Sequence, residues 1–174
     1  MADCGHVRFN VMRNALYHEA RQLVLERVNR VFSLIIILLG TGAMLSVLTS
    51  WLPTELIGAT VATTGALQLV FDFSRRACEH AHLKRAYYEL LAEIDENPNA
   101  TEEQCTSWHA KMVRLTAQEP PTLKALDAIA YNDAADALEL PEDDRLIIPW
   151  YCRIFAHFWR FNGMRFNKIG EGKG

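Results

Sequence analysis

The sequence predicts an all-α membrane protein, with a two-helix transmembrane hairpin and a cytoplasmic helical domain. Two long apolar runs and their basic flanks carry this prediction. The first run has no charged residue from Val31 to Thr54, and the second has none between Glu55 and Asp72. About 20 apolar residues in a helix cross the hydrocarbon core of a bilayer. The alternative is a buried hairpin in a soluble helical bundle, where polar-free runs of this length are unusual.

A tight turn separates the two runs. It contains Trp51, Pro53 and Thr54, and proline cannot continue a helix without losing a backbone hydrogen bond. Lysine and arginine lie on both flanks of the hairpin and not in the turn. Because positive residues stay on the cytoplasmic side, we expect both termini in the cytoplasm and the turn outside. The flanking basic residues are Arg21, Arg27, Arg30, Arg75, Arg76, Lys84 and Arg85.

Composition limits the remaining possibilities. The chain has 174 residues, of which 50% are hydrophobic, yet its mean hydropathy is −0.03, so its apolar residues are concentrated in the hairpin. A net charge of −3 does not favour nucleic acid as a partner. The cysteines Cys4, Cys78, Cys105 and Cys152 lie far apart, which is typical of free thiols in a reducing compartment.

We divide the chain into four parts. Residues 1–30 form an amphipathic N-terminal helix that continues into the membrane; we expect it to pack against the C-terminal half, and the alternative is that it lies on the membrane surface. Residues 31–74 form the transmembrane hairpin, residues 75–161 a cytoplasmic helical region, and residues 162–174 a disordered tail. Within the helical region, Pro98 ends one helix, and Thr101 with Gln104 predicts a capping box at the start of the next.

Small residues recur every four positions in both apolar runs. Rows of this kind let helix backbones approach closely in lipid, so they would close the hairpin on itself or on a neighbouring copy. A homo-oligomer is therefore expected. The candidate helix-packing residues are Gly42, Ser46, Gly58, Ala62, Gly65 and Ala66.

Polar residues also share one face of the second run. Thr60, Thr64, Gln68 and Asp72 are spaced by four, and polar side chains at membrane depth usually face a bundle interior or water. Several copies with this face inward would create a pore, so we group these four with Glu55 as candidate pore-lining residues. Alternatively, the threonine hydroxyls bond to their own helix, and Gln68 and Asp72 lie near the interface.

Aromatic residues dominate the C-terminal segment, which we expect to be helical over residues 147–161. Trp150 and Trp159, together with Trp51 in the turn, are candidate membrane-interface residues, because aromatic side chains beside arginines suit that environment. The alternative is that the same face packs on the N-terminal helix or on a second subunit.

The sequence does not predict an enzyme. It contains no glycine-rich phosphate loop and no nucleophile elbow. Cys78, His80 and His82 lie close together on one helix, but zinc needs about four ligands, usually from more than one element. We therefore predict no catalytic, cofactor-binding or metal-binding residues.

Taken together, the chain resembles the SLATT group of two-transmembrane effector domains (SMODS and SLOG-associating). The resemblance covers most of Asn14 to Leu138 and is carried by the basic helix before the hairpin, the short turn, the helix at residues 84–94 and the segment 120–138. It implies a pore-forming or membrane-disrupting effector of a bacterial anti-phage or conflict system. Such a protein would oligomerise in the inner (cytoplasmic) membrane when a signalling or sensor partner triggers it. The alternative function is a membrane anchor or scaffold that recruits a cytosolic partner.

Overall fold

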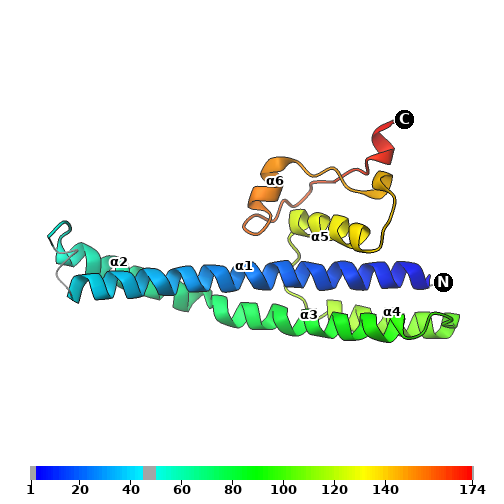
Figure 1. The fold of residues 1–174 in the computed structure, drawn as a ribbon, viewed down its shortest axis with the longest axis horizontal. Helices are drawn as coiled ribbons and strands as arrows, with labels where there is room; N and C mark the ends of the chain where they lie inside the picture. The colour runs from blue at the N-terminus through cyan, green and yellow to red at the C-terminus, as the bar shows by residue number, and fades with distance from the viewer. Residues whose placement is uncertain (1–2, 45–49, 174) are drawn as a thin grey trace. The chain divides into compact units, whose positions relative to one another are not determined.

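The computed structural model describes residues 3–44 and 50–173 of the protein. The chain there is all-α, as predicted, and its only strand-like pairing within these residues is an isolated bridge between Leu146 and Lys168. The helices are α1 (Cys4–Met44), α2 (Thr54–Phe71), α3 (Phe73–Asp95), α4 (Glu102–Thr116), α5 (Lys124–Ala137) and α6 (Trp150–Phe155), with short 3-10 helices η1 (Glu142–Asp144) and η2 (Gly170–Lys173) (Figure 1).

The chain forms two compact units. Unit 1 contains Met1–Arg21 and His80–Gly174, and unit 2 contains Gln22–Glu79. Helices α1 and α3 each contribute residues to both units. The expectation that the N-terminal helix continues into the first apolar run is confirmed, since α1 is unbroken to Met44.

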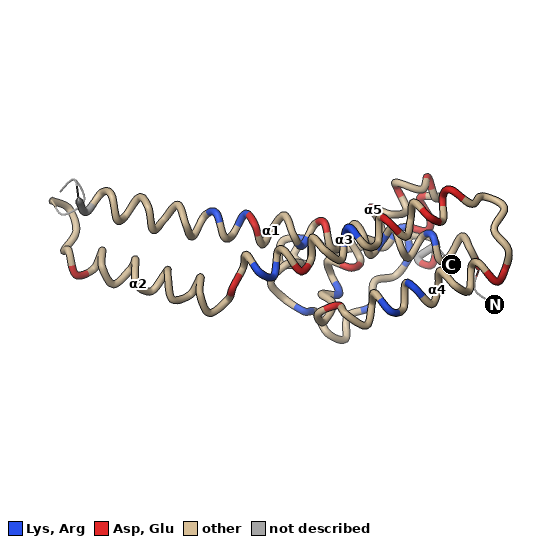
Figure 2. Tube along the Cα trace, turned by 90° about the horizontal axis from the view of Figure 1, so that it is seen from below, with Lys and Arg blue, Asp and Glu red and all other residues tan. Residues whose placement is uncertain are grey.

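In unit 2, α2 lies beside the second half of α1, and the two helices run in opposite directions (Figures 1 and 2). The predicted break before α2 is confirmed: Pro53 precedes the helix, and its carbonyl accepts bonds from the amides of Leu56 and Ile57. At the other end, Asp72 adopts a left-handed conformation with φ 43°. Its amide donates to the carbonyl of Gln68, and its carboxylate accepts from the amide of Arg75, so Asp72 ends α2 and caps α3.

Unit 1 is built around the first half of α1, which contacts two apolar clusters. The first cluster joins α1 to α3 and α4, and the second joins α1 to α5 and α6, so the N-terminal helix packs on the C-terminal half as expected. The first contains Val7, Val11, Ala15, Tyr87, Leu90, Ile94, Cys105 and Trp108. The second contains Tyr17, Leu123, Ala125, Leu126, Ala128, Ala130, Ile148, Cys152 and Ala156.

Polar contacts fix the same helices in unit 1. Arg13 donates two hydrogen bonds to the carboxylate of Asp127, at 2.8 and 3.1 Å, and this pair joins α1 to α5. Lys111 contacts Glu93 at 2.6 Å and joins α4 to α3. The predicted capping box is confirmed, because the side chains of Thr101 and Gln104 each accept a bond from the other's backbone amide.

Three expectations are wrong. Cys4 and Cys105 form a disulfide, so only Cys78 and Cys152 are free thiols. The C-terminal helix covers only Trp150–Phe155 of the expected 147–161: Pro149 precedes its first residue, and beyond its end the chain turns back at Phe161 and Gly163, which adopt positive φ values. That return gives residues 162–173 defined contacts in place of a disordered tail: the amide of Ile147 donates to Asn167, and that of Ile169 donates to Arg145.

Candidate functional site

One helical stretch in the described part of the chain, within Thr54–Asp95, is long and apolar enough to cross a membrane. Only 11% of its apolar window is buried, whereas the core helix of a soluble protein would be mostly covered. Helix α1, described to Met44, does not meet the same criterion, and residues 45–49 of its apolar run lie outside the described residues. One candidate span is therefore established, and a two-helix transmembrane hairpin is not confirmed.

Unit 2 exposes large apolar side chains along both of its helices. Leu69 is 82% exposed and Val70 74% on α2, and Ile37 is 60% exposed on α1. Figure 2 shows the tube free of charged residues along α2, with acidic residues at its ends. Glu55 and Asp72 are these acidic residues, and both are exposed. The further exposed apolar residues of this unit are Leu23, Val31, Leu34, Ile35, Leu38, Trp51, Leu52, Leu56, Leu67 and Phe71.

The threonines of the polar face bond to their own helix. The hydroxyl of Thr60 donates to the carbonyl of Leu56 at 2.8 Å, and that of Thr64 donates to the carbonyl of Thr60 at 2.7 Å. This is the alternative that the sequence left open, because a hydroxyl inside an apolar helix satisfies its donor locally. Their oxygen lone pairs can still accept bonds from water.

Gln68 connects α2 to α1. Its amide nitrogen donates to Asn29 Oδ1 at 2.9 Å and to Ser33 Oγ at 3.1 Å. Thr64 and Gln68 are half-buried and Ile57 is buried, so this side of α2 is the one nearest α1. Of the candidate pore-lining residues, Thr64 and Gln68 thus lie partly against α1, whereas Glu55, Thr60 and Asp72 are exposed. We call the contact of Gln68 with Asn29 and Ser33 the polar clasp.

The small-residue face of α2 is open. A Cβ added at Gly58 or Gly65 would meet no described atom within 4 Å, and Ala62 and Ala66 are exposed. This face of α2 therefore has room for a closely packed neighbouring helix. Gly42 is half-buried in α1, and Ser46 lies outside the described residues. Trp51 is 86% exposed at the turn.

Unit 1 contains a buried polar cluster that the sequence did not predict. His18 from α1 is fully buried, and its Nδ1 lies 2.8 Å from Nδ1 of His80 on α3. His18 Nε2 lies 3.2 Å from a carboxylate oxygen of Glu119, which also accepts a hydrogen bond from the Tyr87 hydroxyl. We call these four residues the histidine cluster. Its members are far apart in sequence, so no local pattern could have found it.

Burial sets the protonation of the histidine cluster. Desolvation and the neighbouring His18 lower the pKa of His80 to about 4, so His80 is neutral at ordinary pH. Burial opposes ionisation of Glu119, but its contacts with His18 and Tyr87 hold its pKa below the usual value. Desolvation, and then the bond to Glu119, raise the pKa of Tyr87. No group of three metal-ligating side chains occurs among the described residues.

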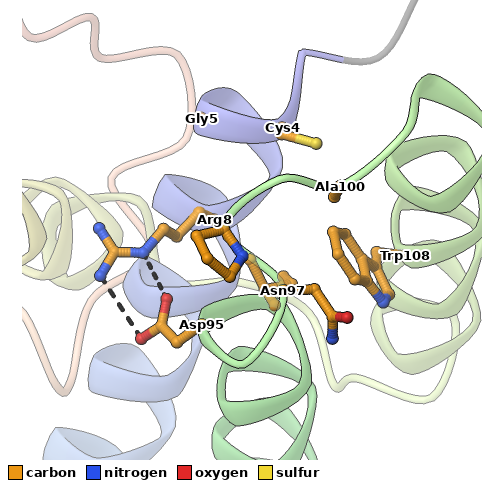
Figure 3. A pocket seen from close by; sticks show the side chains of 9 residues that line it. Cys4, Gly5, Arg8, Asp95, Asn97, Ala100 and Trp108 are labelled. Atoms are coloured by element: carbon orange, nitrogen blue, oxygen red, sulfur yellow. Dashed lines mark hydrogen bonds and ion pairs between the residues drawn. The ribbon is translucent and has the colours of Figure 1, made fainter.

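A surface pocket of about 570 Å³ lies between the start of α1 and the α3–α4 connection (Figure 3). At its wall, Arg8 Nε contacts Asp95 Oδ1 at 2.6 Å, so the two charges neutralise each other. Trp108 is buried behind it and donates its indole N–H to Glu93. The lining offers no unpaired charge and no nucleophile, because Cys4 is in the disulfide. None of the predicted site residues lies here.

The aromatic residues at the C-terminus lie on the surface of unit 1. Trp150 is 72% exposed and Trp159 is 69% exposed, so neither packs on the N-terminal helix, which was one of the expected alternatives.

Comparison with family models, curated proteins and solved structures finds no match to this chain. The SLATT resemblance therefore stays a prediction.

Proposed function

We propose that unit 2 is a two-helix membrane hairpin and that the protein is an oligomeric, pore-forming or membrane-disrupting effector. In this proposal it acts in a bacterial inner membrane and is held inactive until a partner or signal triggers it. The observation that carries the membrane placement is the exposed apolar surface of unit 2 between Val31 and Phe71, where the sequence has one charged residue, Glu55. Apolar area exposed to water costs a free energy of about 25 cal/mol per Å². This number of exposed apolar side chains therefore requires lipid or protein around them.

Assembly follows from the open small-residue face. A single hairpin cannot enclose a pore, so several copies are required, and a cyclic arrangement closes the contacts. A Cβ added at Gly58 or Gly65 would meet no described atom within 4 Å, and Ala62 between them is exposed, so this face permits close approach of a second copy. Tight packing in lipid relies on such small residues, because the hydrophobic effect does not drive apolar helices together there.

The polar clasp supplies a resting state. While Gln68 donates to Asn29 and Ser33, its amide and the half-buried Thr64 are held against α1 and away from a water path. Activation in this proposal separates the two helices at the clasp and turns Thr60, Thr64 and Gln68 towards a shared lumen. The trigger has to supply only a small free energy, since hydrogen bonds between membrane helices contribute about 0.6 kcal/mol each on average.

A membrane anchor or scaffold is the second candidate. It is favoured by the threonine hydroxyls, which already bond to carbonyls of their own helix and need no water. An anchor would insert in the same way but would never conduct ions, so the two candidates differ in ion flux and not in topology.

Assembly is tested by filling the small-residue face. Gly58→Leu or Gly65→Leu should reduce cross-linked oligomers in the membrane and reduce depolarisation of cells that express the protein. Thr63→Leu, on another side of α2, is the matched control and should preserve both. A protein that stays monomeric in lipid under triggering conditions contradicts the pore. Unchanged oligomers in both glycine variants would show that assembly uses another face.

A further inference from the structure

The short helix α6 buries its small side chains and exposes its large ones. Towards the core it places Cys152 and, just beyond its end, Ala156, both at 0% exposure. Outward it places Trp150, at 72%, and Ile154, at 58%, and Phe158 follows at 72%. A helix stabilised only by its own domain would have the reverse arrangement, because burying a large apolar side chain contributes about 1.5–3 kcal/mol. The outer face therefore suits an apolar environment outside the chain.

The exposed apolar residues form one continuous stretch of sequence. They run from Ile147 to Trp159, through α6 and the residues on either side of it, while Cys152 and Ala156 of the same segment are buried in the cluster with α5. Contiguous apolar patches on a soluble surface usually mark an interaction site. We call this the aromatic surface, and its members are Ile147, Trp150, Tyr151, Ile154, Phe155, Phe158 and Trp159.

The charged residues of the segment that carries the aromatic surface are all basic. The sequence has no aspartate or glutamate from Arg145 to Gly170. Arg160 and Arg165 are exposed and form no ion pair with any described residue, and Arg153 is exposed with only a longer-range attraction to Asp133. The other two basic residues of this stretch, Arg145 and Lys168, are already paired with acidic residues outside it. The segment is thus apolar, with positive charge at Arg160 and Arg165 that no described acidic residue pairs.

We infer that the aromatic surface docks on an anionic bilayer, with the tryptophans at the headgroup level and the arginines at lipid phosphates. Tryptophan favours this zone because its ring is amphipathic, and arginine pairs with phosphate through a planar fork. A second copy of the chain fits less well, because a two-fold contact through this surface would place arginines against arginines. The inference goes beyond the proposed function, since it concerns unit 1 and not the hairpin.

Bromine quenching of tryptophan in nanodiscs tests the docking. The protein with Trp51→Phe and Trp159→Phe keeps Trp150 and the buried Trp108, and the same protein with Trp150→Phe keeps Trp108 alone. In brominated phosphatidylcholine–phosphatidylglycerol nanodiscs, the first protein should lose fluorescence and the second should not. Phosphatidylcholine alone should reduce the loss, as should Arg153→Gln with Arg160→Gln, whereas Arg114→Gln on α4 should not. No bromine quenching of Trp150 in anionic nanodiscs overturns the inference.

The outcomes that would contradict lipid docking can be told apart. If iodide in the buffer quenches Trp150 instead, the surface is open to solvent. If neither quencher reaches it, the surface is covered by protein, either a second copy or another chain, and lipid docking is equally wrong. Placing Leu69→Trp in the protein that keeps only Trp108 reports on unit 2 by itself. Bromine quenching there without quenching of Trp150 refutes the docking and leaves the proposed membrane hairpin standing.

Discussion

His18 on α1 and His80 on α3 place their Nδ1 atoms 2.8 Å apart in the interior of unit 1. One imidazole must donate to the other, so the pair is stable only while at least one ring nitrogen in the contact is unprotonated. The residues lie near the ends of the unit 1 segments of α1 and α3. A contact between buried histidines at that position makes the packing of the two helices sensitive to acid.

The first prediction concerns pH. His80 has a pKa of about 4 in the folded protein against 6.5 when unperturbed, so between these values the unfolded chain binds a proton that the folded chain does not. Stability is then full above about pH 6.5 and falls as the pH drops towards 4, with a loss of about 2 kcal/mol between about pH 7 and about pH 5. Thermal unfolding in detergent, followed through the near-ultraviolet signal of Trp108, measures it.

His80→Asn should remove most of this acid sensitivity, because asparagine can keep a hydrogen bond to His18 and does not titrate. His82→Asn, on the exposed side of the same helix, is the control and should leave the pH profile unchanged. An unaltered profile in the His80 variant would mean that other groups cause the loss. Glu119 does not contribute to the loss of stability between about pH 7 and about pH 5. Because its pKa is lowered in the folded protein, its effect on stability is lost only below the ordinary pKa of 4.5.

The second prediction concerns the disulfide. Cys4 and Cys105 are 101 residues apart, and closing so long a loop restricts the unfolded chain strongly. Cys4→Ser with Cys105→Ser should lower the free energy of unfolding of unit 1 by about 2–4 kcal/mol. Cys78→Ser, which removes an exposed free thiol, should cost little. Thiol titration of the denatured, unreduced protein should find two reactive cysteines, and four would contradict the pairing.

The third prediction concerns the side of the membrane on which unit 1 lies. The disulfide and the basic flanks of the hairpin favour different sides. Disulfides are typical of oxidising compartments, whereas the basic flanks of the hairpin predict a cytoplasmic unit 1. Cys78 is the suitable reporter because it is exposed, whereas Cys152 is buried and Cys4 is bonded. A membrane-impermeant maleimide should not label Cys78 in intact cells, but should label a Thr54→Cys variant that carries Cys78→Ser. Labelling of Cys78 from outside would reverse the orientation.

Local signals explain which parts of this fold could be predicted. Pro53 ended the apolar run and the Thr101–Gln104 box began α4, because both act through backbone bonds within one turn. The disulfide and the histidine cluster join residues far apart in the chain, and only the packing of α1 against α3 and α4 brings them together. The length of α6 was overestimated because its aromatic residues have helical spacing, while positive φ at Phe161 and Gly163 ends the segment.

The sequence predicts that polar residues share one face of α2, but it does not predict which residues they contact. A spacing of four places Thr60, Thr64 and Gln68 together on any helix. Which neighbour covers that face depends on the rotation of α2 against α1, and the sequence pattern contains no information on Gln68 pairing with Asn29 and Ser33.

The polar clasp gives the most direct test of the proposed effector. Asn29→Ala with Ser33→Ala removes both acceptors of Gln68 and leaves the polar face of α2 unchanged. At about 0.6 kcal/mol for each bond, the released arrangement becomes roughly sevenfold more populated. Thr41→Ala is the control, since its hydroxyl bonds only to carbonyls of its own helix.

The decisive measurement is ion flux from liposomes that contain the purified Asn29→Ala, Ser33→Ala protein. We predict faster flux than for the unaltered protein or for the Thr41→Ala control. Adding Thr60→Val and Thr64→Val should abolish that flux, whereas adding Thr63→Val should not, because only the first pair shares the face of Gln68. A clasp-deficient protein that inserts and oligomerises yet passes no ions would contradict the pore and leave the membrane anchor as the function.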